Sequence, residues 1–262
     1  MRGAVYQMAT YKIYPLKLAE FQQHEKSTLL YLQGAGEKLI TPIIAYLIQG
    51  EGLNILVDTG CSGPEWAVAH HHPIVQTEDM KILNVLKAHG VTPDDLTCIV
   101  NTHLHWDHCW NNDLFPGKKI HVQKSELDFA MNPLPTQWAY YESEQIGLNP
   151  PFKKAMDQFV LVNGDVKLFD GIELKYIPSH TPGFQGVLVD TTAGKYLIAS
   201  DCLGRFENWE GNGVMKHIPS AIHVDLNQCY QTYAKIEQVC QYILPGHDSK
   251  VFEHSVYPPE NS

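Results

Sequence analysis

The most informative segment of the chain is Thr102-His103-Leu104-His105-Trp106-Asp107-His108, which follows the apolar run 98–100. In an extended segment side chains alternate, so His103 and His105 lie on one side, and Asp107 and His108 can turn toward a second point nearby. Imidazole nitrogens and carboxylate oxygens suit zinc and similar divalent ions. The alternative is a polar loop with surface histidines, and ligands elsewhere in the chain decide between the two.

The composition is that of a globular protein without a nucleic-acid or membrane partner. The 262 residues are 44% apolar and 18% charged, enough for one large domain or two fused halves. A formal charge of −10 argues against binding nucleic acid. No apolar run approaches the roughly 20 residues of a membrane span. The first residues lack the apolar region of a signal peptide, so we expect a cytoplasmic protein.

Cysteine and histidine usage points the same way. The chain has six dispersed cysteines and no Cys-x-x-Cys pair, which predicts reduced thiols rather than a disulfide framework. Fourteen histidines are more than packing requires and give weight to metal chemistry.

Before this segment, the chain reads as a β-hairpin followed by loops and a helix. Runs 41–48 and 53–57 are separated by a Gly-containing turn, and an aromatic-rich strand is expected near residues 6–14. Asp58 ends the second run, either as a turn cap or as a carboxylate that orients a metal-bound histidine. Residues 61–77, with His70-His71-His72, are predicted to be an irregular, solvated loop at the mouth of a site. Residues 79–89 are expected to form one helix.

After the segment, residues 125–131 are expected to be helical, and 132–151 lack periodicity. Short helices that form a lid over 125–157 are the preferred interpretation, and a packed surface excursion is the alternative. A helix that begins at Asp225 should bury a face of Leu226, Cys229, Tyr230, Tyr233 and Ile236.

Three further polar residues follow apolar strands: His180, Asp201 and His247. Strand ends at one sheet edge converge, so distant residues can build one site. His103, His105 and His180 form one three-nitrogen set, and Asp107, His108 and His247 form a second. Asp201 could place an oxygen on each of two ions about 3.5–4 Å apart that share one hydroxide. Alternation turns Cys202 away from this site. The order of elements predicts one domain over 1–262, with β-then-α halves at roughly 1–115 and 116–262 and two sheets packed face to face.

Together these residues resemble the metallo-β-lactamase superfamily. The resemblance rests on His103-x-His105-x-Asp107-His108, His180-Thr181-Pro182-Gly183, Asp201 and Gly246-His247-Asp248, and covers nearly the whole chain. It implies an α/β (α+β) fold, a four-layer αββα sandwich. Within the superfamily the chain is similar to the N-acyl homoserine lactonase and 4-pyridoxolactonase branch, on its length and on segments 56–60 and 122–126.

The chain departs from that branch at three places. Trp110 and Asn111 stand where the branch usually has glycines, and Phe184 stands where it often has a histidine. Gly204 stands where homoserine lactonases carry a tyrosine three residues after the bridging aspartate.

The resemblance implies a dinuclear metal hydrolase, with zinc preferred over iron, manganese or cobalt. A metal-bridging hydroxide would open a lactone or related ester, a quorum-quenching activity, and Asp107 or water would protonate the leaving alkoxide. A small molecule is the only partner expected, for a monomer or homodimer. The alternatives are a diiron oxidoreductase, which His105 disfavours, a hydrolase of β-lactams, thioesters or phosphodiesters, and a non-catalytic scaffold.

Seven aromatic residues near the ligands are predicted to line the substrate pocket: Trp66, Trp106, Trp110, Trp138, Phe184, Phe206 and Trp209. Trp110 and Phe184 would narrow it, which predicts poor activity on long-chain acyl homoserine lactones relative to compact or aromatic lactones.

Overall fold

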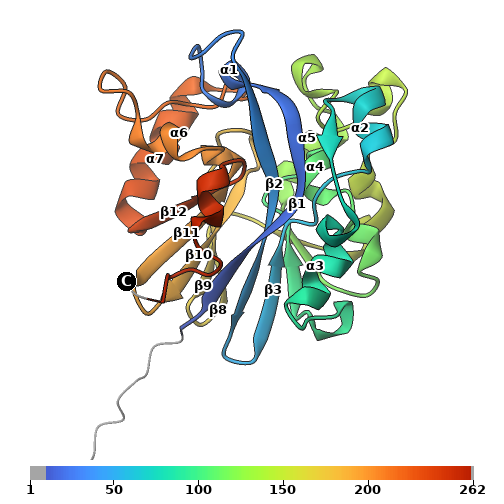
Figure 1. Cartoon of the computed structure of the whole chain (residues 1–262), viewed down its shortest axis with the longest axis vertical. Helices are drawn as coiled ribbons and strands as arrows, with labels where there is room; N and C mark the ends of the chain where they lie inside the picture. Colours follow the sequence, from blue (N-terminus) through green and yellow to red (C-terminus); the bar gives the residue numbers. More distant parts are fainter. Residues whose placement is uncertain (1–9, 261–262) are drawn as a thin grey trace, which may run out of the picture.

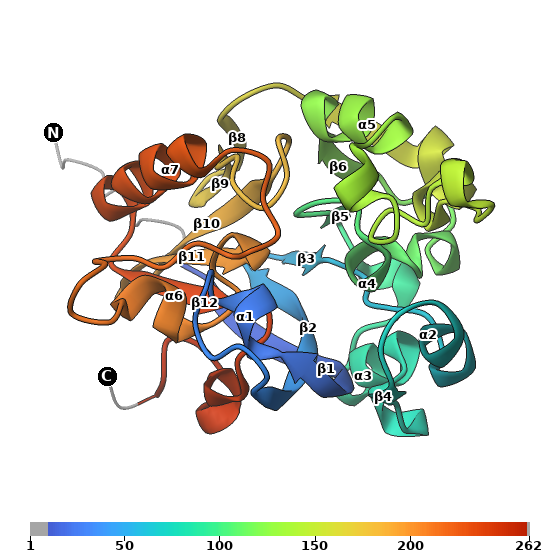
Figure 2. The ribbon, with the colours of Figure 1, turned by 90° about the horizontal axis from the view of Figure 1, so that it is seen from above.

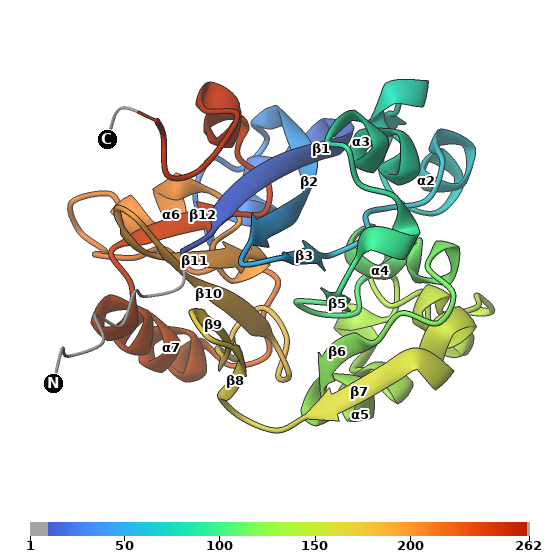
Figure 3. The same cartoon turned by 90° about the horizontal axis from the view of Figure 1, so that it is seen from below.

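Two β-sheets face each other, and helices cover the outer face of each. The computed structural model describes residues 10–260. In Figure 1 the sheets stand in the middle, with helices α6 (Phe206–Glu210) and α7 (Leu226–Val239) on one side. Helices α2 to α5 lie on the other side, and the two perpendicular views agree (Figures 2 and 3). The predicted four-layer αββα arrangement is confirmed.

The first sheet has the strand order β4-β1-β2-β3-β5-β6-β7 and the second β12-β11-β10-β9-β8. The strands of the first sheet are β1 (Lys12–Glu25), β2 (Lys38–Gly50), β3 (Leu53–Val57), β4 (Ile74–Val75), β5 (Cys98–Val100), β6 (Ile120–Gln123) and β7 (Phe159–Val162). Those of the second are β8 (Val166–Phe169), β9 (Ile172–Tyr176), β10 (Gln185–Thr191), β11 (Gly194–Ser200) and β12 (Tyr242–Pro245).

The helices are short, apart from α7. The remaining α-helices are α1 (Lys26–Leu29), α2 (Pro64–His70), α3 (Ile82–Ala88), α4 (Trp106–Cys109) and α5 (Lys124–Met131). The 3-10 helices are η1 (Glu78–Met80), η2 (Pro93–Asp95), η3 (Asn112–Leu114), η4 (Pro135–Gln137), η5 (Glu144–Ile146), η6 (Pro151–Gln158), η7 (Asp201–Leu203) and η8 (Ser249–Glu253). None of the described helices is long and apolar enough to cross a membrane.

Alternation along β2 explains how one strand serves two cores. Ile44, Tyr46 and Ile48 face the core between the sheets, whereas Ala45 and Leu47 face the helices on the outer side. Because both faces are covered, the strand is an almost continuous apolar run. Each fully buried aliphatic side chain of this kind contributes roughly 1.5–3 kcal/mol to the stability of the fold.

Parallel pairing brings the polar strand ends together. Val57 of β3 pairs with Val100 of β5, so Asp58 and the segment after residue 100 leave the first sheet at the same edge. In the second sheet Ser200 of β11 pairs with Pro245 of β12, which places Asp201 beside His247. The candidate site lies where these two edges meet.

Several local expectations need correction. Residues 61–77 are not irregular, because Pro64 at the first turn and Glu65 begin helix α2. The helix predicted over 79–89 is interrupted at Lys81, which is extended. The first strand begins at Lys12, and the expected strand residues Tyr6 and Met8 lie outside the described residues.

Two larger expectations also change. The chain moves to the second sheet after residue 162 rather than near residue 115, because β6 and β7 extend the first sheet.

Helix α7 is capped by Asp225, which accepts a hydrogen bond from the backbone N–H of Asn227 at 2.8 Å. Its buried face includes Thr232, whereas Tyr230, predicted to be buried, is exposed.

Candidate metal centre

The seven residues predicted to bind metal lie together at the meeting point of the two sheets. Their ligand atoms form three overlapping groups, each within 4.8 Å: His103, His105, His180; then Asp107, His108, His247; then His103, His108, Asp201. All seven side chains are buried or nearly so. The first two groups are the two sets proposed from the sequence, and the third joins them.

Asp201 lies between the two sets. Its Oδ2 is 3.6 Å from His180 Nε2 in the first set and 3.4 Å from His108 Nε2 in the second. Its Oδ1 is 3.1 Å from His247 Nε2. One carboxylate oxygen can therefore contact ligands of both sets, which is the geometry that a bridging ligand requires.

The donor atoms fit divalent cations. His103 Nε2 and His108 Nε2 are buried and have no hydrogen-bond partner among the described residues, which is costly for polar atoms unless another species satisfies them. His105 Nδ1 and His180 Nε2 lie 3.1 Å apart. Two nitrogens bound tetrahedrally at about 2.0–2.1 Å from one zinc ion are about 3.3 Å apart. Nitrogen and carboxylate donors in this arrangement therefore suit zinc or a similar ion.

Asp58 orients His108. Asp58 Oδ2 accepts a hydrogen bond from His108 Nδ1 at 2.9 Å, so the lone pair of Nε2 points into the centre. The hydroxyl of Thr102 donates to the same carboxylate at 2.8 Å and lies 3.1 Å from His103 Nδ1, from which it accepts. One carboxylate thus fixes the ring orientation of two candidate ligands, which supports the second interpretation of Asp58.

Two other contacts of this kind were missed from the sequence. His105 Nε2 donates to Gln137 Oε1 at 3.0 Å, which leaves Nδ1 facing the centre. His247 Nδ1 donates to the backbone carbonyl of Pro42 at 2.8 Å. A backbone carbonyl has no sequence signal. Gln137 lies in a segment without periodicity, so neither could have been identified from spacing.

Glu126 is a third residue that sequence reasoning missed as an individual contributor. Its buried carboxylate accepts hydrogen bonds from Leu104 N at 3.0 Å, Thr181 Oγ1 at 2.6 Å and Tyr141 Oη at 2.7 Å. It therefore connects the loop that carries His103 and His105 to the loop that carries His180. Burial raises the pKa of this carboxyl, although these hydrogen bonds oppose the shift.

Glycine is required where the His180 loop meets the backbone of Glu126. A Cβ atom on Gly183 would lie 2.0 Å from Glu126 N, far inside van der Waals contact. Gly246 is similar, since its Cβ would lie 2.2 Å from Asp201 Oδ1. Close approach therefore explains the glycine in both Pro-Gly pairs beside candidate ligands.

The electrostatics of the two sets differ. Burial lowers the pKa of His103 and His105 well below the ordinary histidine value, and neighbouring imidazoles add to the effect. Burial lowers the pKa of His180 to about 4. At His108 burial acts in the same direction, but the carboxylates of Asp201, Asp107 and Asp58 outweigh it and raise the pKa. The first set is ready to bind a cation as neutral imidazoles, and the second attracts positive charge.

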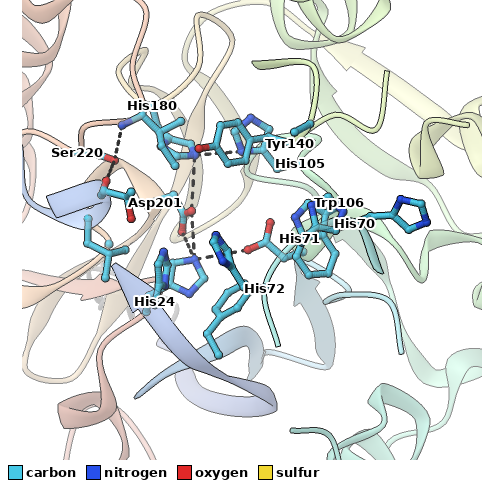
Figure 4. A pocket seen from close by; sticks show the side chains of 18 residues that line it. His24, His70, His71, His72, His105, Trp106, Tyr140, His180, Asp201 and Ser220 are labelled. Carbon is cyan, nitrogen blue, oxygen red and sulfur yellow. Dashed lines mark hydrogen bonds and ion pairs between the residues drawn. The ribbon is translucent and has the colours of Figure 1, made fainter. Parts of the chain in front are cut away.

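A cavity of about 260 Å³ opens onto the centre (Figure 4). Its lining includes five of the seven candidate ligands, namely His105, Asp107, His180, Asp201 and His247. The rest of the wall consists of Phe21, His24, Thr28, Leu29, His70, His71, His72, Trp106, Ala139, Tyr140, Gly204, Ser220 and Ile222.

Of the seven aromatic residues predicted to line the substrate pocket, Trp106 alone is among the described residues of this cavity wall. Phe184 is fully buried, its ring centroid lies 4.9 Å from that of His103, and it is not part of the cavity wall. Trp110 lies outside, beside the ring of Trp66 at 5.6 Å. Neither Trp110 nor Phe184 narrows the cavity.

The other aromatic residues are occupied elsewhere. Trp66 donates a hydrogen bond to Glu142 at 2.5 Å, and Trp138 donates to the carbonyl of Pro133 at 3.0 Å. Trp209 stacks on His217 at 4.2 Å, and Phe206 packs against the cores beside the second sheet. Cys202 is buried in the core under α7, turned from the centre as expected.

The triple histidine lies at the cavity mouth with His70 and His72 exposed, as expected, but it is at the end of helix α2 rather than in an irregular loop. His70, His71 and His72 line the cavity from the end of α2. The His71 ring stacks on Trp106 with centroids 4.0 Å apart, and its Nε2 lies 2.8 Å from the buried Glu142 carboxylate. His71 thereby joins α2 to the segment 132–151.

Comparisons with known proteins agree with this geometry. A family model described as the metallo-beta-lactamase superfamily matches residues 41–249. An N-acyl homoserine lactonase of a Bacillus species is 34% identical over 187 residues, which are 67% of this chain and 69% of that relative. N-acyl homoserine lactonase AttM of Rhizobium radiobacter is 26% identical over 242 residues, 87% of this chain and 90% of the relative.

Solved structures extend the similarity to the whole fold. One is an N-acyl homoserine lactone hydrolase with its product N-hexanoyl-L-homoserine bound at the catalytic metal centre. It has a TM-score of 0.73 and 26% identity, and covers 94% of this chain and 96% of its own. A Bacillus thuringiensis variant with N-decanoyl-L-homoserine bound at the active site gives the same four values. The chain belongs to the metallo-beta-lactamase superfamily.

Proposed function

We infer that this chain is a metal-dependent hydrolase that opens the ring of N-acyl homoserine lactones, a quorum-quenching activity. The observation that carries this inference is the pair of neighbouring donor sets with Asp201 between them. The relatives named as N-acyl homoserine lactonases support the substrate class. The solved relative with a ring-opened product at its metal centre supports the reaction.

The donor sets are suited to two ions, zinc first, with iron, manganese or cobalt as the other candidates. His103, His105 and His180 would hold one ion, Asp107, His108 and His247 the other, and Asp201 would contact both. Such a pair supplies a hydroxide nucleophile at neutral pH and an electrophile for the lactone carbonyl. Three carboxylates, Asp58, Asp107 and Asp201, surround His108. Their charge balances that of two divalent cations and one hydroxide.

Asp107 has a proposed role beyond metal binding. Its carboxylate lines the cavity, with Oδ2 3.7 Å from both His108 Nε2 and His247 Nε2. It can therefore hold a proton where the ring oxygen leaves and pass it to the departing alkoxide. The sequence interpretation that gave this role to Asp107 or to water is retained.

The substrate range needs revision. Discrimination against long acyl chains was expected because Trp110 and Phe184 would narrow the pocket. Since neither lines the cavity, that reason no longer holds. The apolar part of the wall includes Leu29 and Ile222. We therefore include both short-chain and long-chain N-acyl homoserine lactones in the proposal.

The surroundings of the site belong to the same proposal. Residues 1–262 would act as one domain, because strands of both sheets supply the donor atoms. The segment 125–157 would be a fixed wall rather than a moving lid, since Gln137 and Glu142 bond to His105 and His71. The cysteines are all free, which supports a reducing cytoplasm.

The test is a hydrolysis panel over acyl homoserine lactones, aryl esters, β-lactams and phosphodiesters. Protein purified without added metal is analysed for zinc and iron first, which separates a zinc hydrolase from a diiron oxidoreductase. We expect lactone hydrolysis that chelation abolishes and zinc restores. Asp107→Ala and His108→Ala should lose at least a hundredfold in kcat/KM. The proposal fails if no lactone is hydrolysed in a metal-dependent way.

A further inference from the structure

We propose that Tyr140 is a catalytic residue whose hydroxyl donates a hydrogen bond to the carbonyl oxygen of the substrate. The inference rests on the proposed lactonase function. It assigns to the segment between η4 and η5 a direct part in the reaction. The observations that carry it are the position of the Tyr140 ring, its anchoring, and the state of the other hydroxyl groups in the cavity.

The Tyr140 ring lies against a ligand of the three-nitrogen set. Its centroid is 5.2 Å from that of His105, with the ring planes 31° apart. Tyr140 lines the same cavity as Asp107, His180 and Asp201. In Figure 4 the Tyr140 ring is drawn over His105, with its hydroxyl end on the side of His180. A carbonyl oxygen placed at the first donor set would meet this hydroxyl.

The backbone of Tyr140 is tied to the ligand-bearing segment itself. Its carbonyl oxygen accepts a hydrogen bond from Trp106 N at 2.9 Å, so the residue next to His105 positions it. Tyr141 packs on His105 from another direction, with centroids 4.6 Å apart and planes 78° apart. The hydroxyl of Tyr141 already donates to Glu126, so the two neighbouring tyrosines have different tasks.

The other hydroxyl groups on the cavity wall have their protons committed. Thr28 Oγ1 donates to the carbonyl of Glu25 at 2.6 Å, and Ser220 Oγ donates to the carbonyl of Thr28 at 3.3 Å. Gly204, also on the wall, has no side chain to offer. Among the described residues, nothing accepts a hydrogen bond from the Tyr140 hydroxyl, which therefore remains available to a ligand.

The nearby imidazoles are less suitable donors. His71 Nε2 is bound to Glu142, and His24 Nδ1 is bound to Thr41 Oγ1 at 2.9 Å. In Figure 4 His70 lies beyond His71 and Trp106, away from Tyr140, and His72 lies beside His24, on which it stacks. The side of His105 and His180 is thus served by Tyr140.

The proposed role requires a hydrogen-bond donor to the carbonyl oxygen that stays protonated throughout the reaction. Water adds to the carbonyl carbon, charge develops on the carbonyl oxygen, and the ring C–O bond then breaks to give a hydroxy acid. A phenol carries its proton at neutral pH and can stabilise that developing charge throughout. Removal of one such donor from a hydrolase typically costs about 10²–10³-fold in kcat.

The experiment compares wild type with Tyr140→Phe, which keeps the ring against His105 and removes one oxygen. Both proteins are loaded with zinc and assayed on N-hexanoyl homoserine lactone. We expect kcat/KM to fall about a hundredfold, mostly in kcat, with unchanged zinc content and Tm. Calorimetric binding of the ring-opened product, N-hexanoyl-L-homoserine, should weaken about fivefold, because one hydrogen bond is lost.

The matched control is Tyr230→Phe, an exposed tyrosine on α7 outside the cavity, which should equal wild type. A Tyr140→Phe protein within twofold of wild type in kcat/KM and in product binding overturns the inference and leaves the proposed function standing. Loss of zinc or of Tm in that variant assigns the hydroxyl a structural role and overturns it as well. A wild-type protein inactive on every lactone overturns the proposed function and the inference together.

Discussion

The carboxylate of Asp58 holds His108 through Nδ1 at 2.9 Å, from a backbone position with a φ of 63°. A non-glycine residue rarely adopts this left-handed conformation, although aspartate and asparagine tolerate it better than others. The turn directs both carboxylate oxygens back over the segment that follows β5. The left-handed backbone at the end of β3 thus allows Asp58 to hold the His108 imidazole in one orientation.

Asp58→Asn should therefore weaken metal binding without unfolding the protein. Asparagine tolerates the same backbone conformation, but it lacks the charge and has one acceptor oxygen for four donors. We expect zinc affinity to fall about 10–100-fold, as measured by competition with a chromophoric chelator. Asp94→Asn, at an exposed position, is the control. Equal zinc affinity in the two variants would contradict the orienting role of Asp58.

Gly183→Ala should be far more damaging than Gly63→Ala. The first Cβ would lie 2.0 Å from Glu126 N, whereas the second meets nothing within 4 Å. Because backbone atoms cannot move aside cheaply, the His180 loop must shift. We expect Gly183→Ala to lose at least several kcal/mol of stability or its zinc, and Gly63→Ala to lose less than about 1 kcal/mol. Denaturant unfolding and metal analysis measure both, and equal stability would refute the close contact.

His24 should make the fold sensitive to acid. Burial, aided by His247 and His72, lowers its pKa to about 3, below the ordinary value of 6.5. Between these values the unfolded chain binds a proton that the folded chain refuses, so stability falls as pH drops from about 6.5 to about 3. Above this window the group has no effect.

The slope from one such group is about 1.4 kcal/mol per pH unit. Tm measured against pH for wild type and His24→Gln checks this, since glutamine can still bond to Thr41. The variant should lose less Tm on acidification than wild type. Parallel curves would show that folding does not lower the pKa of His24.

Metal removal should lower Tm by an amount that depends on free metal. A site at a hundredfold excess of ion over Kd stabilises the folded state by about 2.7 kcal/mol. For a chain of this size that corresponds to roughly 5–10 °C. Differential scanning calorimetry with and without chelator measures the change. A Tm indifferent to zinc concentration would argue against buried ligands shared by both sheets.

Gly204→Leu and Trp110→Ala should distinguish a residue that lines the cavity from one that lies outside it. Gly204 lines the cavity, has an ordinary helical backbone, and its Cβ would stand 3.6 Å from Leu29 Cδ2, so a side chain fits and fills space. We expect kcat/KM for N-decanoyl homoserine lactone to fall at least tenfold, and more than for the hexanoyl substrate.

Trp110→Ala should leave the ratio of these two kcat/KM values within twofold, because Trp110 lies outside the cavity. If instead Trp110→Ala broadens chain-length tolerance and Gly204→Leu does not narrow it, the cavity described here is not the acyl site.

The sequence was sufficient to predict the strands and the candidate ligands, because both follow from local patterns of apolar and polar residues. Polar residues at the ends of apolar runs identified all seven side chains that the structure brings together, because strand ends share an edge. It failed for contacts that depend on distant backbone. His247 bonds to the carbonyl of Pro42, 205 residues away, and no residue type encodes that carbonyl.

Closeness in sequence was also a poor guide to which way a side chain faces. Phe184 lies four residues after His180, yet it turns into the core under α7. Tyr140, 32 residues beyond His108, reaches the cavity. Helix α2 was missed because histidines, glycine and proline dominate its surroundings, although Pro64 is a good first helical residue.

Each donor set contains residues that follow strands of both sheets, so neither sheet supplies a complete set. His103 follows β5 of the first sheet, whereas His180, Asp201 and His247 follow strands of the second. Bound ions would therefore cross-link the two sheets, which otherwise contact each other through apolar side chains. The affinity for metal then depends on the position of one sheet relative to the other. A substitution deep between the sheets, such as Ile44→Val, should register first as looser zinc binding, before any loss of fold is measurable.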